Sequence, residues 1–315
     1  MPGVEEIKQQ VALESARRAR LGVPAVAGGV LYILSGAIIS STLGGAPTVG
    51  LLQGLVPALR GEPNPAVSPR AVEVKFISHH AFALIAGSTL AAIAIGLLTL
   101  VLLLLLEATR FRRPGTWRQA RSLILFGGVA VAVVSVGHQV VGAIETHNFA
   151  VGHDLTNHAV DQALTKGTAN IVTEYLDLLA GLALAAGMIA TMVNAMRVGL
   201  ITRWMGILGI FTGVLVFLPL GGATLGFVPA FWLLAMGFLY LGRWPNGDPP
   251  AWAAGEARPW PSQAELRAKQ AAEREGSSKR AKPPLARVEG DLVPEPAPPV
   301  SGSSRRRRRK RGARR

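Results

Sequence analysis

Four ionisable residues in the middle of the chain have the types and spacing that a metal or proton site requires. His138 and Glu145 lie seven residues apart, and Glu174 and Asp177 lie three apart, so each pair falls on one face of a helix. All four lie inside or at the edge of apolar stretches, where ionisable groups are costly and usually face inward toward partners. We predict that they converge, with one or more nearby histidines, on either a divalent-metal site or a protonatable cluster.

In an alternative interpretation, these side chains bind neither a metal nor a functional proton. In that case His138 hydrogen-bonds a neighbouring helix, and the carboxylates mark the boundary with water. No HExxH or paired HxxxH motif supports a metal site on a single helix. The two interpretations remain open at the level of sequence.

Motifs for other chemistries are missing. The sequence contains no cysteine, which excludes disulfides, thiolate catalysis and zinc–thiolate sites. It also has no GxSxG, phosphate-loop or dinucleotide-binding motif in a proper context. These absences favour a non-enzymatic protein; the alternative is a metal- or proton-coupled transporter or membrane enzyme that uses the His/carboxylate cluster. A divalent metal is the one cofactor that the sequence suggests.

The stretches that must position these residues are long and apolar. Residues Ala81–Leu106 include 26 consecutive positions without a charge. A helix needs roughly 20 such residues to cross a hydrocarbon layer about 30 Å thick. Half of all residues are hydrophobic, and the mean hydropathy is +0.34. The sequence therefore predicts an all-α, multi-pass integral membrane protein.

Six apolar stretches follow one another along the chain. The predicted spans are residues 21–43, 79–106, 122–144, 171–196, 204–220 and 224–241. The fifth would reach about 25 Å at helical rise, which is near the short limit for crossing. Before the first span, residues 1–20 are polar, and they predict either a short amphipathic helix on the cytoplasmic face or a frayed terminus.

The distribution of basic residues predicts the orientation. Arginines cluster before the first span, between spans two and three, between spans four and five, and after span six. The three connections on the opposite side hold four Lys or Arg in total, namely Arg60, Arg70, Lys75 and Lys166. Short basic loops stay cytoplasmic, so both termini are predicted to be cytoplasmic in the plasma membrane.

Small residues recur inside the predicted spans. Gly127 and Gly187 lie in spans three and four, and Gly209 and Gly213 form a GxxxG pattern in span five. Glycines at this spacing permit helices to approach closely. We interpret them as packing features of the bundle, with a homodimer contact as the alternative.

Residues 243–315 differ from the rest of the chain. They carry 18 Lys or Arg against 8 Asp or Glu, a net charge of +10. Composition predicts a disordered, polybasic cytoplasmic tail. Trp244, Trp252 and Trp260 are spaced by eight among prolines, which suits either ring anchoring at the lipid headgroups or a disordered linker.

The chain ends in a dense cationic run, with nine positive charges in eleven residues. Near the inner leaflet each such charge favours binding to anionic lipid by about 1 kcal/mol. Anionic phospholipid is the favoured partner beyond the bilayer itself, nucleic acid is the competing one, and simple retention of the C-terminus inside is a third interpretation. The predicted contact residues are Arg305, Arg306, Arg307, Arg308, Arg309, Lys310, Arg311, Arg314 and Arg315.

Residues 197–247 contain a short pattern that is also found in other membrane proteins. Arg203-Trp204 opens the fifth span, and small residues follow it in MGILGIFTG. In this respect the segment resembles the closing helical hairpin of uncharacterised bacterial six-span membrane proteins, of a domain-of-unknown-function type. The resemblance implies six spans and brings no functional residues with it.

Overall fold

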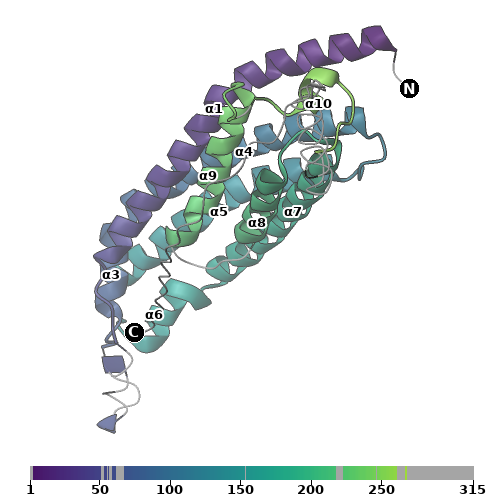
Figure 1. Cartoon of the computed structure of the whole chain (residues 1–315). Coiled ribbons are helices and arrows are strands. Elements are labelled where there is room, and N and C mark those ends of the chain that lie inside the picture. Colours follow the sequence, from purple (N-terminus) through teal and green to yellow (C-terminus); the bar gives the residue numbers. More distant parts are fainter. Residues whose placement is uncertain are drawn as a thin grey trace, which may run out of the picture. The chain divides into compact units, whose positions relative to one another are not determined.

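A computed structural model describes residues 3–50, 53–54, 56, 59–61, 67–152, 154–217, 223–245, 247–260 and 267. In this part the chain is all-α, as predicted (Figure 1). The folded unit runs through Trp260, and residues 261–315 form a second unit in which Arg267 alone is described. The elements are α1 (Val4–Gly44), α3 (Ala71–His79), α4 (Ala81–Arg112), α5 (Ala120–Val151), α6 (Asn157–Asp161), the π-helical turn η1 (Gln162–Lys166), α7 (Thr168–Val198), α8 (Arg203–Phe217), α9 (Ala223–Tyr240) and α10 (Pro250–Ala254).

The long helices form a closed bundle. Along the sequence, α1 packs against α4, α4 against α5, α5 against α7, α7 against α8 and α8 against α9, and α9 then packs against α1. Consecutive helices run in opposite directions, so the bundle has two distinct ends (Figure 1). We call one the basic end, which holds Arg18, Arg112 and Arg203, and the other the histidine end, which holds His80 and His147.

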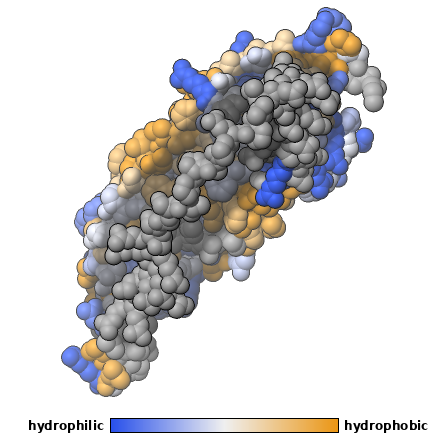
Figure 2. Space-filling view, viewed as in Figure 1, coloured by the Kyte–Doolittle hydropathy of each residue, from blue (hydrophilic) through white to orange (hydrophobic). Residues whose placement is uncertain are grey.

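Four helices in the described part are long and apolar enough to cross a membrane: α1, α4, α5 and the stretch Asn157–Val198 that contains α7. Helices α8 and α9 are apolar but shorter. Large apolar side chains face outward, for example Phe82 at 85% and Phe126 at 68% exposure. Hydrophobic residues cover much of the visible side of the helices, and hydrophilic residues gather mostly toward the ends (Figure 2). These features are typical of a multi-pass membrane protein.

Several predicted boundaries shift. The polar residues before the first span continue without a break into α1, which begins at Val4. The second predicted span, 79–106, is interrupted at His80, where the backbone (φ −104°, ψ 12°) departs from the helix and separates α3 from α4. Helix α8 is described as far as Phe217, and residues 218–220 of the fifth predicted span lie outside the described residues.

Glycines permit the closest helix contacts in the bundle. A Cβ atom at Gly127 of α5 would overlap the backbone nitrogen of Leu184 on α7. A Cβ at Gly187 of α7 would lie 2.7 Å from the Ile124 side chain on α5. Both helices thus present a small residue where the other approaches, which supports the packing interpretation of these glycines.

Residues 243–260 are folded, which moves the predicted start of the tail. They include α10, and both Ala251 and Trp252 are buried in the main hydrophobic core. The sequence-based boundary at Arg243 is therefore too early, because the charge and proline content that marked it does not show the buried contacts of Trp252. We call residues 243–260 the C-terminal strap.

Candidate functional site

The most unusual polar side chain inside the bundle is Asp177, on α7 toward the histidine end. Its Oδ1 atom is buried and accepts no hydrogen bond from any residue that the structure describes. The carboxylate lies within electrostatic range of His138 of α5 and of Tyr32 of α1, and no hydrogen bond joins it to either of them in the described part of the chain. A buried oxygen without a donor is costly, and in a native structure it calls for an explanation such as a functional role or a bound water. We call Tyr32, His138, Thr173 and Asp177 the Asp177 cluster.

His138 is held in place by the neighbouring helix. Its Nδ1 lies 2.9 Å from Oγ1 of Thr173 on α7. The Thr173 hydroxyl donates to its own helix, at 3.0 Å from the carbonyls of Ala169 and Asn170, so its oxygen accepts from Nδ1–H. In the neutral ring, Nε2 then carries the lone pair. This hydrogen bond between helices is the one that the non-chemical interpretation expects, and it fixes the orientation of the ring.

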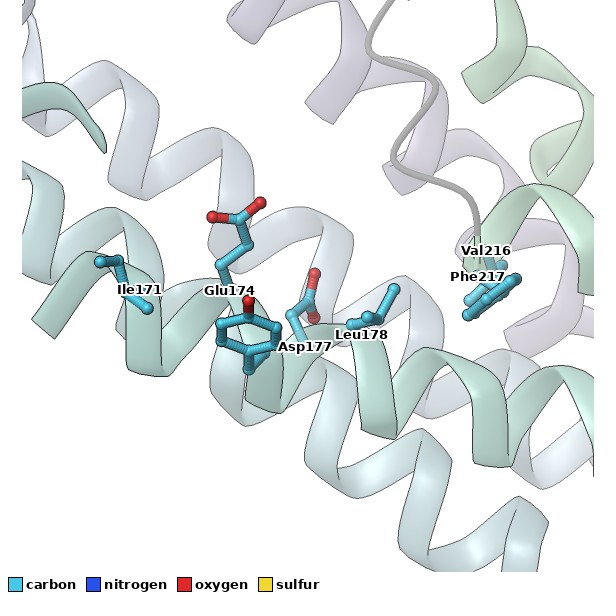
Figure 3. A pocket seen from close by; sticks show the side chains of 7 residues that line it. Ile171, Glu174, Asp177, Leu178, Val216 and Phe217 are labelled. Carbon is cyan, nitrogen blue, oxygen red and sulfur yellow. The ribbon is translucent and has the colours of Figure 1, made fainter. Parts of the chain in front are cut away.

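Two cavities border this cluster. Asp177 and Glu174 line one of about 290 Å³, together with Ile171 of α7 and Phe217 of α8. Figure 3 shows both carboxylates rising from the same side of α7, as their spacing predicts. His138 lines a second cavity of about 200 Å³ between α5, α1 and α4. The carboxylate therefore borders one space large enough for water, and the imidazole borders another.

The structure brings the four predicted site residues together only in part. Glu174 and Asp177 line the same cavity, and Glu174 is exposed. His138 lines a different cavity, and in the described part no hydrogen bond or ion pair joins it to Asp177. Glu145 is two helical turns from His138 and, in the described part, forms no hydrogen bond or ion pair with the other three. No three His, Asp or Glu side chains of the described residues come close enough to hold a metal ion. His153 lies outside these residues.

A second polar group lies at the basic end, and sequence reasoning missed it. Glu14 of α1 and Arg112 of α4 form a two-pronged ion pair, with nitrogen–oxygen distances of 2.9 and 2.8 Å. Their side chains are 4% and 0% exposed. Arg112 also donates to the carbonyls of Ala108 and Ala251, so most of its donors are used.

The C-terminal strap is fixed through the same group. Arg18 donates to Asp248 at 2.7 Å and to the Leu239 carbonyl at 2.7 Å. The Trp252 ring lies 4.5 Å from the Arg18 guanidinium and 5.6 Å from that of Arg112. We call Glu14, Arg18, Arg112, Asp248 and Trp252 the basic-end cluster. The four-residue spacing of Glu14 and Arg18 in the polar N-terminal segment was the signal that could have indicated it.

Indole nitrogens attach the strap to the link between α7 and α8. Trp252 Nε1 donates to the Leu200 carbonyl at 2.8 Å, and Trp260 Nε1 donates to the Ile201 carbonyl at 3.0 Å. The predicted ring anchoring at lipid headgroups therefore does not hold for Trp252, which is 3% exposed and buried in protein. Each cluster has one buried side-chain atom without a hydrogen-bond partner among the described residues, Arg18 Nε in the basic-end cluster and Asp177 Oδ1 in the Asp177 cluster. Because several short charged hydrogen bonds join its members, we interpret the basic-end cluster as a structural contact between α1, α4 and the strap.

The predicted polyanion-contact residues, from Arg305 to Arg315, lie outside the described residues. No protein-family model, no curated protein and no solved structure matches this chain.

Proposed function

We propose that the chain is a plasma-membrane protein that crosses the bilayer six times. Helices α8 and α9 reach about 22 and 27 Å at helical rise. They complete the bundle between α7 and α1, which supports placing them in the same layer as the four long helices. The basic end faces the cytoplasm in this proposal, because arginines gather there and short basic segments are retained inside.

The function that the chain supports best is non-enzymatic: its cytoplasmic tail binds the anionic inner leaflet. The observation that carries this proposal is the attachment of the C-terminal strap. Trp260 is hydrogen-bonded to Ile201 between α7 and α8, so the polypeptide that continues from Pro261 starts at the basic end. The nine terminal charges then belong to a chain that begins beside the headgroups, where each adds about 1 kcal/mol of attraction.

A flotation experiment tests this proposal. The full chain is placed in nanodiscs of phosphatidylcholine and mixed with vesicles made with or without phosphatidylglycerol. We expect binding to the anionic vesicles alone, weakened by salt, and lost when residues 305–315 are deleted. A matched control replaces the acidic residues Glu289, Asp291 and Glu295 by their amides and keeps binding. Unchanged binding after the deletion would refute the proposal, as would a clear preference for added RNA over the vesicles.

A second function is favoured by the Asp177 cluster, in which we infer a proton-binding site that couples protonation to movement of the helices or of a substrate. The Oδ1 of Asp177, which has no donor among the described residues, carries this inference, since protonation would remove the charge that is costly to bury there. Among the two predicted kinds of site, proton binding needs only His138 and Asp177, whereas a metal needs further ligands.

Two measurements separate the alternatives. A pH titration followed by infrared difference spectroscopy should show a carboxyl band that Asp177→Asn removes and that Glu107→Gln, at the other end of the bundle, retains. Elemental analysis of the detergent-purified protein should show no stoichiometric divalent metal. A metal present in the wild type and lost in His138→Ala would overturn the proton interpretation and support a metal site.

A further inference from the structure

An apolar groove runs between α8 and α9 in the half of the bundle nearer the basic end. It encloses about 450 Å³, within the roughly 300–1,000 Å³ of typical ligand sites. Trp204 and Leu208 of α8 form one wall, and Phe231 and Phe238 of α9 form the other. From Phe231 to Phe238 the groove follows α9 for about 10 Å at helical rise.

The aromatic walls of the groove are not packed against the protein. Trp204, Phe231 and Phe238 are 65%, 55% and 46% exposed. Such a run of open aromatic surface is unfavourable in water, but it is suited to a flexible hydrocarbon chain that enters from the bilayer. The groove thus differs from the cavities beside Asp177, whose linings include carboxylates and a histidine.

One end of the groove attracts anions. Arg243 and Trp244 close it at the basic end, directly after α9. No carboxylate of the described residues lies within 4 Å of the Arg243 guanidinium, in contrast to Arg18 and Arg112. The N-terminus of α8, where Arg203 precedes Trp204, lies at the same end and adds positive helix-dipole charge. Indole rings and this guanidinium, which has no ion-pair partner among the described residues, form the polar half of the site, as suits the headgroup level of a membrane.

We propose that this groove binds one anionic phospholipid, with the phosphate at Arg243 and an acyl chain between α8 and α9. The charge complementarity at one end and the apolar walls at the other select this occupant over a second copy of the chain. The inference rests on the membrane placement proposed above, and it is independent of the polybasic tail.

The test uses the chain without residues 305–315, so that tail binding does not contribute. The delipidated protein in detergent is titrated with phosphatidylglycerol or phosphatidylcholine and followed by native mass spectrometry. We expect one tightly bound phosphatidylglycerol per chain. Arg243→Gln should lower that affinity about fivefold, the effect of one headgroup charge, and should reduce the preference over phosphatidylcholine.

A second variant tests the apolar half. Ala235→Trp places an indole within the groove lining and should displace the bound lipid of either kind, while Arg113→Gln, at the basic end but outside the groove, should change neither affinity nor preference. Brominated phospholipids, which quench the tryptophans they contact, provide a readout on the folded protein. If the new indole displaces the bound lipid, tryptophan fluorescence in Ala235→Trp should be quenched less than one additional lipid-accessible indole would predict.

Equal lipid binding by the wild type, Arg243→Gln and Ala235→Trp would overturn the proposal. So would a stable dimer that excludes lipid and that Ala235→Trp dissociates, because the groove would then be an interface between copies. If deletion of residues 305–315 abolishes flotation with anionic vesicles while the groove lipid stays bound, both proposals are supported, each by its own measurement. If flotation survives the deletion, the tail proposal fails, and the groove proposal is still decided by the lipid titration.

Discussion

Removing Glu14 should destabilise the folded protein strongly, because it leaves the buried Arg112 guanidinium without its counter-charge. Both nitrogen–oxygen contacts are short, at 2.9 and 2.8 Å, and both side chains are almost fully buried. Two charge-assisted hydrogen bonds from Arg112 are lost in Glu14→Ala, each worth about 1.5–3 kcal/mol, together with one from Gln10. Breaking a buried pair from one side costs about 3–5 kcal/mol, so we expect a loss in this range.

A matched control lies nearby. Arg17 and Glu107 join the same two helices by an ion pair of 2.6 Å, but their side chains are 58% and 40% exposed. Exposed pairs contribute about 0–1 kcal/mol, so Glu107→Ala should change the free energy of unfolding by at most that amount. Geometry alone would rank the two pairs alike, and burial is what separates them.

Equilibrium unfolding in mixed detergent micelles measures both variants. Hydrogen exchange adds a local readout, since the C-terminal strap contacts Arg112 through Ala251 and should lose protection in Glu14→Ala. Replacing both partners, in Glu14→Ala with Arg112→Met, should recover part of the loss, because no unpaired charge remains buried. Equal effects of Glu14→Ala and Glu107→Ala would refute the reasoning from burial.

Two further predictions follow from other parts of the bundle. Gly127→Ala should cost about 1–3 kcal/mol of unfolding free energy, since its Cβ would overlap the Leu184 backbone, whereas Gly137→Ala, with open space around its Cβ, should be neutral or slightly stabilising. In the loop helix α6, the hydrogen bond and charge of Lys166, with the charge of Arg70, hold the pKa of Asp161 below its ordinary value. Stability from this group is complete above the unfolded pKa, near 4, and is lost as the pH falls through the lower folded value. Hydrogen exchange of residues 154–167, corrected for intrinsic rates, should show this loss in the wild type and a flat response in Asp161→Asn; a flat wild-type response would contradict it.

Much of the fold was predictable from local pattern. The apolar run from Ala81 to Leu106 requires a helix of membrane length because its backbone groups must pair within the helix. The same argument applies to α5 and α7. The predicted boundaries were less accurate. Helix α1 begins at Val4, because nothing in the polar segment interrupts a helix. The break at His80 was not predicted, because no proline or glycine marks it in the sequence.

The candidate site itself stays a prediction. The spacing of Glu174 and Asp177 correctly placed them on one face of α7, and the hydrogen bond of His138 to a neighbouring helix is the one that the non-chemical interpretation expected. Sequence spacing did not indicate Tyr32, which comes from α1, because a contact between distant segments leaves no local periodicity.

The sequence by itself determined that the chain forms long apolar helices of the kind that cross a membrane. Hydropathy and charge can be read from each residue in turn, without knowledge of its partners. Only the tertiary structure decided which polar groups find partners. Helix packing gave Arg112 a carboxylate from Glu14, 98 residues away, and left Asp177 Oδ1 without a donor among the described residues. It also buried Trp252 between two guanidinium groups in a segment whose composition predicts disorder. Pairing depends on the distance between side chains after folding, and that distance is set by the packing of the whole bundle.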